Sequence, residues 1–130
     1  MPKMSDTLLY PELSFLVCGL CFNVHNELGR YRSEKQYADL LEVKFKENGV
    51  KYEREQFLAP SFPGEGKRNK PDFLVEDRLV LDLKAKSIIT KDDYFQMKRY
   101  LDSAKKQLGI IVNFRQLYLR PKRVIRGKDS

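Results

Sequence analysis

The stretch PDFLVEDRLVLDLKAK at residues 71–86 most constrains the fold of this chain, because it has the pattern of a β-hairpin. Two apolar runs, at residues 71–75 and 79–86, flank the charged segment 76–78, which is typical of a tight turn. Three charged residues interrupt these runs: Asp72, Asp82 and Lys84. The hairpin is therefore either a surface element with a solvated charged face or a scaffold that holds these charges together.

The length of the turn decides how these charges lie. Side chains in a strand alternate between two faces, so Asp82 and Lys84 share one face while leucine and alanine side chains fill the other. A three-residue turn at 76–78 puts Asp72 directly opposite Asp82, whereas a two-residue turn puts the two acids on opposite faces. The sequence alone leaves both registers open.

Two facing carboxylates fit a site for a hard divalent metal. Opposed residues have Cβ atoms about 4.5–5.5 Å apart, and two carboxylates that close need a proton, a cation or bulk water between them. Mg²⁺ binds through one or two protein carboxylates and keeps several waters. Lys84 would stabilise charge that develops on a phosphate, or help to position and deprotonate an attacking water. The same residues also fit an exposed hairpin, because Asp-x-Lys occurs by chance in many sequences.

Two residues outside the hairpin extend this candidate site. Glu34 shares a helix face with Tyr37 and Leu41, so its carboxylate is expected to project towards the sheet and to bind a metal through water. Its alternative role is to complement the helix dipole from the first turn. Gln96 lies off the apolar stripe of a later helix, where an exposed side chain is the usual outcome.

The rest of the chain predicts an α/β fold with a mixed central β-sheet flanked by helices, in the order α-α-β-β-β-α-β with a further β at the end. The predicted elements are a helix at 11–28, a helix capped by Ser33 and closed by Gly49, strands at 51–58, 71–75 and 79–86, a helix capped by Thr90 that ends before Gly109, a strand at 109–114 and an edge strand within 117–125. Residues 60–69 are predicted to form a Pro/Gly-rich loop.

Composition and length are those of one globular domain. A chain of 130 residues can bury one core, and 42% hydrophobic with 33% charged residues argues against disordered and fibrous classes. We expect residues 1–130 to form a single domain, with flexible tails at about 1–10 and 125–130. The apolar runs are too short to span a bilayer or to form a signal peptide, so we expect a soluble, cytoplasmic protein with no membrane partner.

The net charge of the chain indicates its kind of partner, and its two cysteines raise the question of a redox or metal motif. The formal charge of +7 and the pI near 9.4 favour polyanionic partners, among which nucleic acid is the commonest inside cells. The basic excess is concentrated late in the chain, and we predict Lys86, Lys98 and Arg99 as nucleic-acid contacts. Cys18 and Cys21 form a C-x-x-C, but they lie in an apolar helical stretch, so we interpret them as small buried hydrophobes rather than as a redox or metal motif.

Pro71-Asp72 followed by Asp82-Leu83-Lys84 resembles the PD-(D/E)XK nuclease superfamily, with Glu34 and Gln96 in the expected order. More narrowly, the chain resembles the small GxxExxY proteins of that superfamily over about residues 13–124. The matching segments are FNVHNELG, EKQY, YERE, KPDFLVEDRLVLDLKAK, QMKRYL and LGIIVNF. The chain departs from that pattern at two positions. Tyr31 stands where the family has Gly, and Asp82 stands where the family usually has Glu.

The resemblance implies a restriction-endonuclease-like core and Mg²⁺-dependent hydrolysis of phosphodiester bonds, with Mn²⁺ as a substitute and DNA favoured over RNA. By position it implies Asp72 and Asp82 as metal ligands, Lys84 as the catalytic lysine and Glu34 as an outer or additional ligand. Gln96 would be an orienting residue. His25 matches a further family element and, with Tyr37, is a candidate lining residue, although a lone histidine on an apolar helix is more often structural.

Two other functions remain open from the sequence. The first is a catalytically silent module that keeps the nuclease fold and binds nucleic acid or a protein partner. The second is an interaction protein whose basic tail contacts acidic partners. For a nuclease, one domain offers one active site, so cutting both strands of a duplex favours a homodimer.

Overall fold

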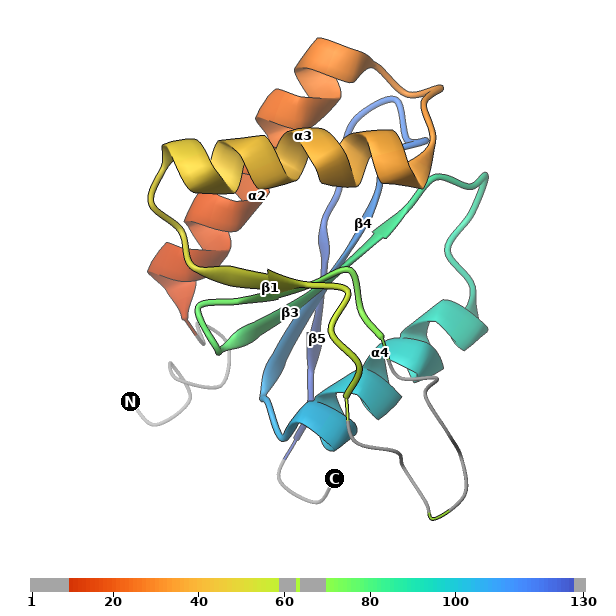
Figure 1. The fold of residues 1–130 in the computed structure, drawn as a ribbon. Helices are drawn as coiled ribbons and strands as arrows, with labels where there is room; N and C mark the ends of the chain where they lie inside the picture. The colour runs from red at the N-terminus through yellow and green to blue at the C-terminus, as the bar shows by residue number, and fades with distance from the viewer. Residues whose placement is uncertain (1–9, 59–62, 64–69, 128–130) are drawn as a thin grey trace.

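The computed structural model of the protein describes residues 10–58, 63 and 70–127, and Figure 1 shows their arrangement. The predicted order of helices and strands is confirmed, including the last strand. The elements are α2 (Pro11–Leu28), α3 (Glu34–Glu47), β1 (Tyr52–Arg54), β2 (Phe73–Val75), β3 (Leu79–Lys84), α4 (Lys91–Ala104), β4 (Leu108–Asn113) and β5 (Lys122–Ile125). The predicted loop at 60–69 lies outside the described residues apart from Pro63.

The five strands form one mixed sheet in the order β1-β2-β3-β4-β5. Only the β3–β4 pair is parallel, and α4 makes the crossover between these two strands. The other neighbouring pairs are antiparallel. The predicted α/β fold with a mixed central sheet is therefore confirmed, and β3 and β4 end at the same edge of the sheet.

Alternation along β3 separates two layers of core. Leu79, Leu81 and Leu83 belong to the larger cluster, which packs beneath α2 and α3. Val80 belongs to a second cluster on the other face, where Met97 and its neighbours on α4 cover the sheet. Figure 1 shows the same division, with α2 and α3 crossing over one side of the sheet and α4 on the other. Asp82 and Lys84 therefore lie on the α4 face.

Local sequence signals explain the ends of α3. The Ser33 hydroxyl accepts a bond from the Gln36 N–H, and the Gln36 side chain accepts one from the Ser33 N–H, so both halves of the predicted capping box are present. At the other end Gly49 has φ 66°, and Val50 N–H donates to Phe45 O at 2.9 Å. This left-handed turn lets Val50 return to the core.

The ends of α4 place it over the sheet. Thr90 caps the helix reciprocally with Asp93, and Lys105 ends it in a left-handed conformation with φ 56°. The helix packs so closely that a Cβ on Gly109 of β4 would lie 2.4 Å from Met97 Sδ. A larger residue at this point of β4 would therefore require the Met97 side chain to move.

The first strand is shorter than predicted. The sequence pattern extends over 51–58, but β1 covers only Tyr52–Arg54, so that prediction was wrong at its C-terminal end. Glu55 adopts a left-handed conformation with φ 54°, which breaks the strand, and its N–H donates to Asp72 O at 3.0 Å. The break turns the chain away at the point where Asp72 precedes β2.

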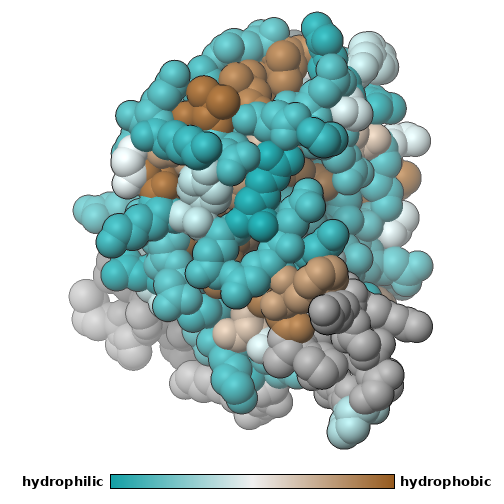
Figure 2. All heavy atoms as spheres, viewed as in Figure 1, coloured by the Kyte–Doolittle hydropathy of each residue, from teal (hydrophilic) through white to brown (hydrophobic). Residues whose placement is uncertain are grey.

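The remaining sequence predictions concern the surface and the tails. Cys21 is buried and Cys18 half-buried, and both are free thiols inside α2, as expected for structural residues. β5 runs to Ile125 and Arg126 N–H donates to Gln107 O at 2.9 Å, so regular structure reaches into the predicted tail at 125–130. The face in Figure 2 is mostly hydrophilic with a few apolar patches. None of the described helices has the length and apolar composition needed to cross a bilayer.

Candidate active site

The hairpin register brings Asp72 and Asp82 together. Val75 pairs with Leu79 and Phe73 with Leu81, as a three-residue turn requires, and this pairing decides between the two registers that the sequence left open. One residue further along, the same register sets Asp72 against Asp82 on the face covered by α4. The ladder ends there, and the Asp72 carboxylate instead accepts a bond from the Leu83 backbone N–H at 2.6 Å.

The turn is centred on residues 76–77, and one further residue, Arg78, precedes β3. Glu76 and Asp77 both have positive φ angles, 53° and 55°, and Arg78 N–H donates to Val75 O at 3.0 Å. Two consecutive positive φ values match the right-handed twist of the flanking strands. The Glu76 carboxylate also accepts a bond from the Lys51 N–H, which ties the turn to the chain before β1.

Burial makes it unfavourable for the two neighbouring carboxylates to carry negative charge. Asp82 is 5% exposed, and its Oδ2 atom has no aligned hydrogen-bond donor among the described residues. The nearest cation is Lys84, whose Nζ lies 2.9 Å from that oxygen but outside hydrogen-bond alignment. A buried carboxylate oxygen without an aligned donor has capacity to bind a further cation.

The raised pKa of Asp72 reflects the cost of burying two acids side by side. Burial raises the pKa of Asp72 from an ordinary value of 3.8 to about 8, and the charges of Asp82 and Glu34 add to the rise. The hydrogen bond from Leu83 N–H acts in the opposite direction but does not prevail. With no metal ion bound, burial and the neighbouring charges therefore favour the protonated form of Asp72 up to a pKa of about 8.

Lys84 is surrounded by oxygen atoms. Its Nζ donates to Gln96 Oε1 at 3.0 Å and lies 2.9 Å from Asp82 Oδ2 and 3.8 Å from Asp93 Oδ1. Burial lowers the pKa of Lys84, but the carboxylates of Asp82, Asp93 and Glu34 outweigh it and raise the pKa overall. The side chain is thus held as an ammonium beside the acid pair, with Gln96 fixing its direction from α4.

Asp93 and Tyr100 also belong to this environment, although we did not predict them from the sequence as site residues. Asp93 is buried, and its Oδ2 accepts bonds from Lys86 Nζ at 2.7 Å and from Thr90 N–H at 2.9 Å. Tyr100 is buried on α4, and burial followed by the charges of Asp82 and Asp72 raises its pKa. Their spacing from Gln96, three residues before and four after, is the sequence signal that indicates a shared helix side.

Glu34 lies at the rim of the site. It is the first residue of α3 and is exposed, but its charge contributes to the raised pKa values of Asp72 and Lys84. Within the described part of the chain, no group of three or more His, Cys, Asp or Glu side chains is gathered closely enough to hold a metal. Glu34 therefore lies apart from the two aspartates in this conformation.

His25 and Tyr37 support the turn that leads to Glu34. His25 Nε2 lies 2.8 Å from Gln116 O and ties α2 to the chain after β4. The Tyr37 hydroxyl donates to Gly29 O at 2.7 Å, and its ring stacks on Phe114 at 4.2 Å. These contacts are with the backbone and the core rather than with the acid pair, so both residues have a structural role here.

The three predicted nucleic-acid contacts differ in their surroundings. Lys86 is paired with Asp93 and keeps 38% of its side chain exposed. Lys98 Nζ donates to Ile125 O at 2.9 Å and to Arg126 O at 3.3 Å, which joins α4 to the end of β5. Arg99 is exposed and lies three residues after Gln96. Of the three, Arg99 is the residue whose charge is most accessible on the Gln96 side of the helix.

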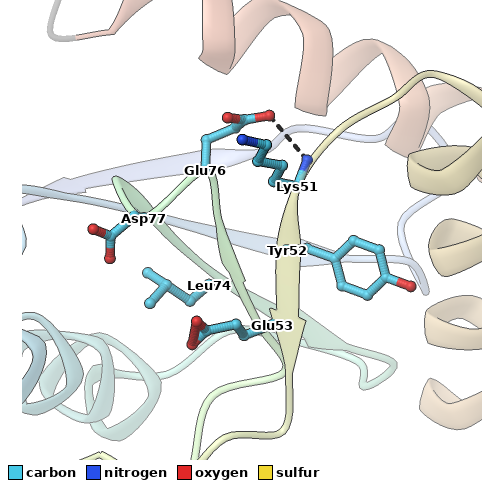
Figure 3. Close-up of a pocket in the computed structure, with 6 residues that line it drawn as sticks. All are labelled: Lys51, Tyr52, Glu53, Leu74, Glu76 and Asp77. Atoms are coloured by element: carbon cyan, nitrogen blue, oxygen red, sulfur yellow. Dashed lines mark hydrogen bonds between the residues drawn. The ribbon is translucent and has the colours of Figure 1, made fainter.

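A pocket lies at the other end of the hairpin, near the turn. Figure 3 shows Glu53, Leu74 and Asp77 on one side of the sheet and Tyr52 directed to the other. The lining residues are Lys51, Tyr52, Glu53, Leu74, Glu76 and Asp77. With three acids against one lysine, this pocket repels a polyanion and does not extend the site at Asp82.

Comparison with known protein families gives one match. The family model described as the PD-(D/E)XK nuclease superfamily matches residues 11–126, which is nearly the whole chain. The chain belongs to the PD-(D/E)XK nuclease superfamily. A search of curated proteins and a search of solved structures each found no match. The narrower likeness to GxxExxY proteins stays a prediction.

Membership of the PD-(D/E)XK superfamily agrees with the observed architecture. The three helices and the five-stranded mixed sheet of the described residues are consistent with a restriction-endonuclease-like fold. The superfamily is one of nucleases that generally use divalent metal ions. The donor set fits such an ion, because Mg²⁺ needs only one or two protein carboxylates and Asp82 Oδ2 is a buried oxygen without an aligned donor.

Proposed function

We propose that the protein is a divalent-metal-dependent nuclease that hydrolyses phosphodiester bonds, with DNA preferred to RNA. The observation that carries this proposal is the buried pairing of Asp72 with Asp82 beside Lys84, in a chain of the PD-(D/E)XK nuclease superfamily. A folded domain has no structural need for two facing carboxylates, because their repulsion destabilises it. A bound metal cation would offset this repulsion, so metal binding is the function that explains the pair.

In this proposal Asp72 and Asp82 hold Mg²⁺, or Mn²⁺ in its place, and Glu34 contributes from the rim through water. When bound, such an ion polarises a phosphate oxygen and lowers the pKa of bound water. The pair is suited to this because the Leu83 N–H fixes the Asp72 carboxylate and the Asp82 side chain is buried. Preorganised ligands do not have to reorient when the ion binds.

Lys84 supplies positive charge next to the acid pair, where it would stabilise charge that develops on the phosphate. Gln96 is the positioning residue for Lys84, since its Oε1 accepts the 3.0 Å bond from Nζ. Asp93, also on α4, lies 3.8 Å from the same Nζ and attracts the ammonium from that side. The Lys84 ammonium thus lies between the carboxylates of Asp82 and Asp93 and the side-chain amide of Gln96.

The test is cleavage of single- and double-stranded DNA, and of RNA, in the presence of Mg²⁺ or Mn²⁺. We expect wild-type protein to cleave, and Asp82→Ala and Lys84→Ala to lose activity by at least about a hundredfold. Asp92→Ala and Lys46→Ala are matched controls, because both residues are exposed and make no contact with the acid pair. Activity that persists in both Asp82→Ala and Lys84→Ala would show that the proposed site is wrong.

The silent-module alternative predicts a different result by calorimetry. A module that only binds partners has no need of Asp72 and Asp82 as metal ligands. Divalent-metal binding that disappears in Asp82→Ala supports the enzyme, whereas an absence of metal binding in wild-type protein supports the silent module. Circular dichroism of each variant separates loss of the site from loss of the fold.

A further inference from the structure

Two arginines contact the ring of an exposed tyrosine close to the candidate active site. Arg30 Nε donates to Arg115 O at 2.9 Å, and Arg115 Nε donates to Arg30 O at 2.7 Å. Both guanidinium groups lie over the Tyr31 ring, 5.1 Å and 5.5 Å from its centroid. Tyr31 itself is 74% exposed. These three residues are called the Arg-Tyr-Arg cluster below.

The contacts within the cluster fix the arginines without neutralising them. Each guanidinium uses its Nε in the reciprocal backbone bond, so its direction is set. Among the described residues, neither arginine forms an ion pair or a hydrogen bond through its Nη atoms. Two oriented guanidinium groups with free Nη donors are the arrangement that binds phosphate oxygens, often through two parallel bonds.

The topology sets this cluster near Lys84. Asn113 is the Cα partner of Lys84 in the parallel pair, and Phe114 N–H donates to Lys84 O at 2.8 Å. Arg115 follows one residue later, so its Cα lies within about 12 Å of the Lys84 Cα, from one strand spacing and two residues of chain. On the other side Tyr31 is three residues before Glu34. The cluster and the acid pair therefore occupy the same edge of the sheet.

We propose that the Arg-Tyr-Arg cluster binds phosphodiester groups of a nucleic-acid strand a few nucleotides away from the acid pair. This inference rests on the proposed function for the nature of the strand, but not on catalysis. The proposal also explains the role of Tyr31, which stands where the GxxExxY pattern has glycine. An exposed aromatic ring at that position supports the two guanidinium groups through cation–π contact, which glycine cannot do.

The test measures binding of labelled single-stranded and duplex DNA in EDTA, where no metal-dependent cleavage occurs. Arg30→Gln and Arg115→Gln should each weaken binding about five- to tenfold. Each should also lower the slope of log K against log salt by about 0.7 on single strands. Lys46→Gln is the matched control, because it removes one exposed charge at the far end of α3. We expect a small effect from this variant, with the slope unchanged.

Tyr31 provides a variant pair that leaves both backbone bonds in place. Tyr31→Phe keeps the ring and should bind like wild type, whereas Tyr31→Leu loses the cation–π contact and should bind more weakly. This pair keeps the proposal testable if an arginine variant fails to fold. Equal weakening by Arg30→Gln, Arg115→Gln and Lys46→Gln would overturn the cluster as a site, and so would equal binding by the two Tyr31 variants.

Two further outcomes separate the classes of ligand and the two proposals. If the arginine variants weaken binding of polyglutamate as much as binding of DNA, the cluster is a general anion site and its assignment to nucleic acid is overturned. If the protein cleaves nothing but both arginine variants still lose DNA affinity, the nuclease proposal fails while the cluster stands. Cleavage that is unaffected by the arginine variants at subsaturating DNA would overturn the cluster alone.

Discussion

The Asp72 carboxylate accepts a 2.6 Å hydrogen bond from the backbone N–H of Leu83, at the point where the β2–β3 ladder has ended. The bond fixes Asp72 beside Asp82 although no ladder pair holds its backbone there. It also makes one oxygen of the Asp72 carboxylate a hydrogen-bond acceptor in the folded protein. Asparagine can replace this acceptor without the charge, which makes the electrostatic cost of Asp72 measurable.

Asp72→Asn should stabilise the metal-free protein at neutral and alkaline pH. The folded-state pKa of Asp72 is raised from 3.8 to about 8 by burial and by the charge of Asp82. Between these two values the folded state binds more protons than the unfolded state, so the free energy of unfolding falls as pH rises from about 4 to about 8. Thermal unfolding in EDTA should show this decline in wild type and a weaker one in Asp72→Asn. Parallel profiles would contradict the raised pKa.

Added Mg²⁺ or Ca²⁺ should raise the melting temperature of wild-type protein, and more at pH 8 than at pH 5. A ligand that binds only the folded state stabilises it by RT ln(1 + [L]/Kd), and the cation binds the deprotonated pair. Asp82→Asn should lose most of this response, while Asp92→Asn, an exposed acid in the first turn of α4, should keep it. An equal response in both variants would mean that the ion binds elsewhere.

The Lys84–Gln96 contact predicts non-additive kinetics. Gln96→Ala should lower kcat about tenfold, because Lys84 loses the acceptor that sets its direction, and Lys84→Ala should lower it further. The double variant should be no worse than Lys84→Ala alone, since Gln96 acts only through the lysine. Rates from a single-turnover cleavage assay would complete the cycle. Fully additive losses would show that Gln96 acts independently of Lys84.

The hairpin and the helix ends were predictable because their signals are local. Alternation along 79–86 and the charged segment 76–78 left only the number of residues in one turn undecided. Ser33 and Thr90 indicated helix caps that the structure contains. The capping pattern predicts where a helix begins without any knowledge of the fold. The resemblance to the PD-(D/E)XK superfamily was also predictable, and the family match over residues 11–126 confirms it.

The partners of individual site residues were less predictable because they depend on the crossover between β3 and β4. The sequence indicates Asp93 only as an acid in the first turn of a helix, yet the position of α4 places it beside Lys84 and Lys86. His25 finds its acceptor at Gln116, 91 positions along the chain. The early end of β1 depends on the backbone of Glu55 rather than on its side-chain pattern. Such contacts follow from tertiary geometry, which periodicity does not encode.

Lys98 and Arg99 are adjacent basic residues, but the structure predicts opposite behaviour for their substitutions. Lys98 Nζ donates to the carbonyls of Ile125 and Arg126, so Lys98→Met should lower the free energy of unfolding by about 1–2 kcal/mol. The two bonds direct the ammonium towards the end of β5, so Lys98→Met should change the salt dependence of DNA binding less than a substitution of Arg99 does.

Arg99→Gln should do the reverse, since Arg99 is exposed on the Gln96 side of α4. We expect unchanged stability and a lower salt slope for DNA binding. Urea unfolding and fluorescence anisotropy at several salt concentrations measure both quantities on the same proteins. A lower salt slope in Lys98→Met with unchanged stability would instead make Lys98 a nucleic-acid contact and its bonds to β5 dispensable.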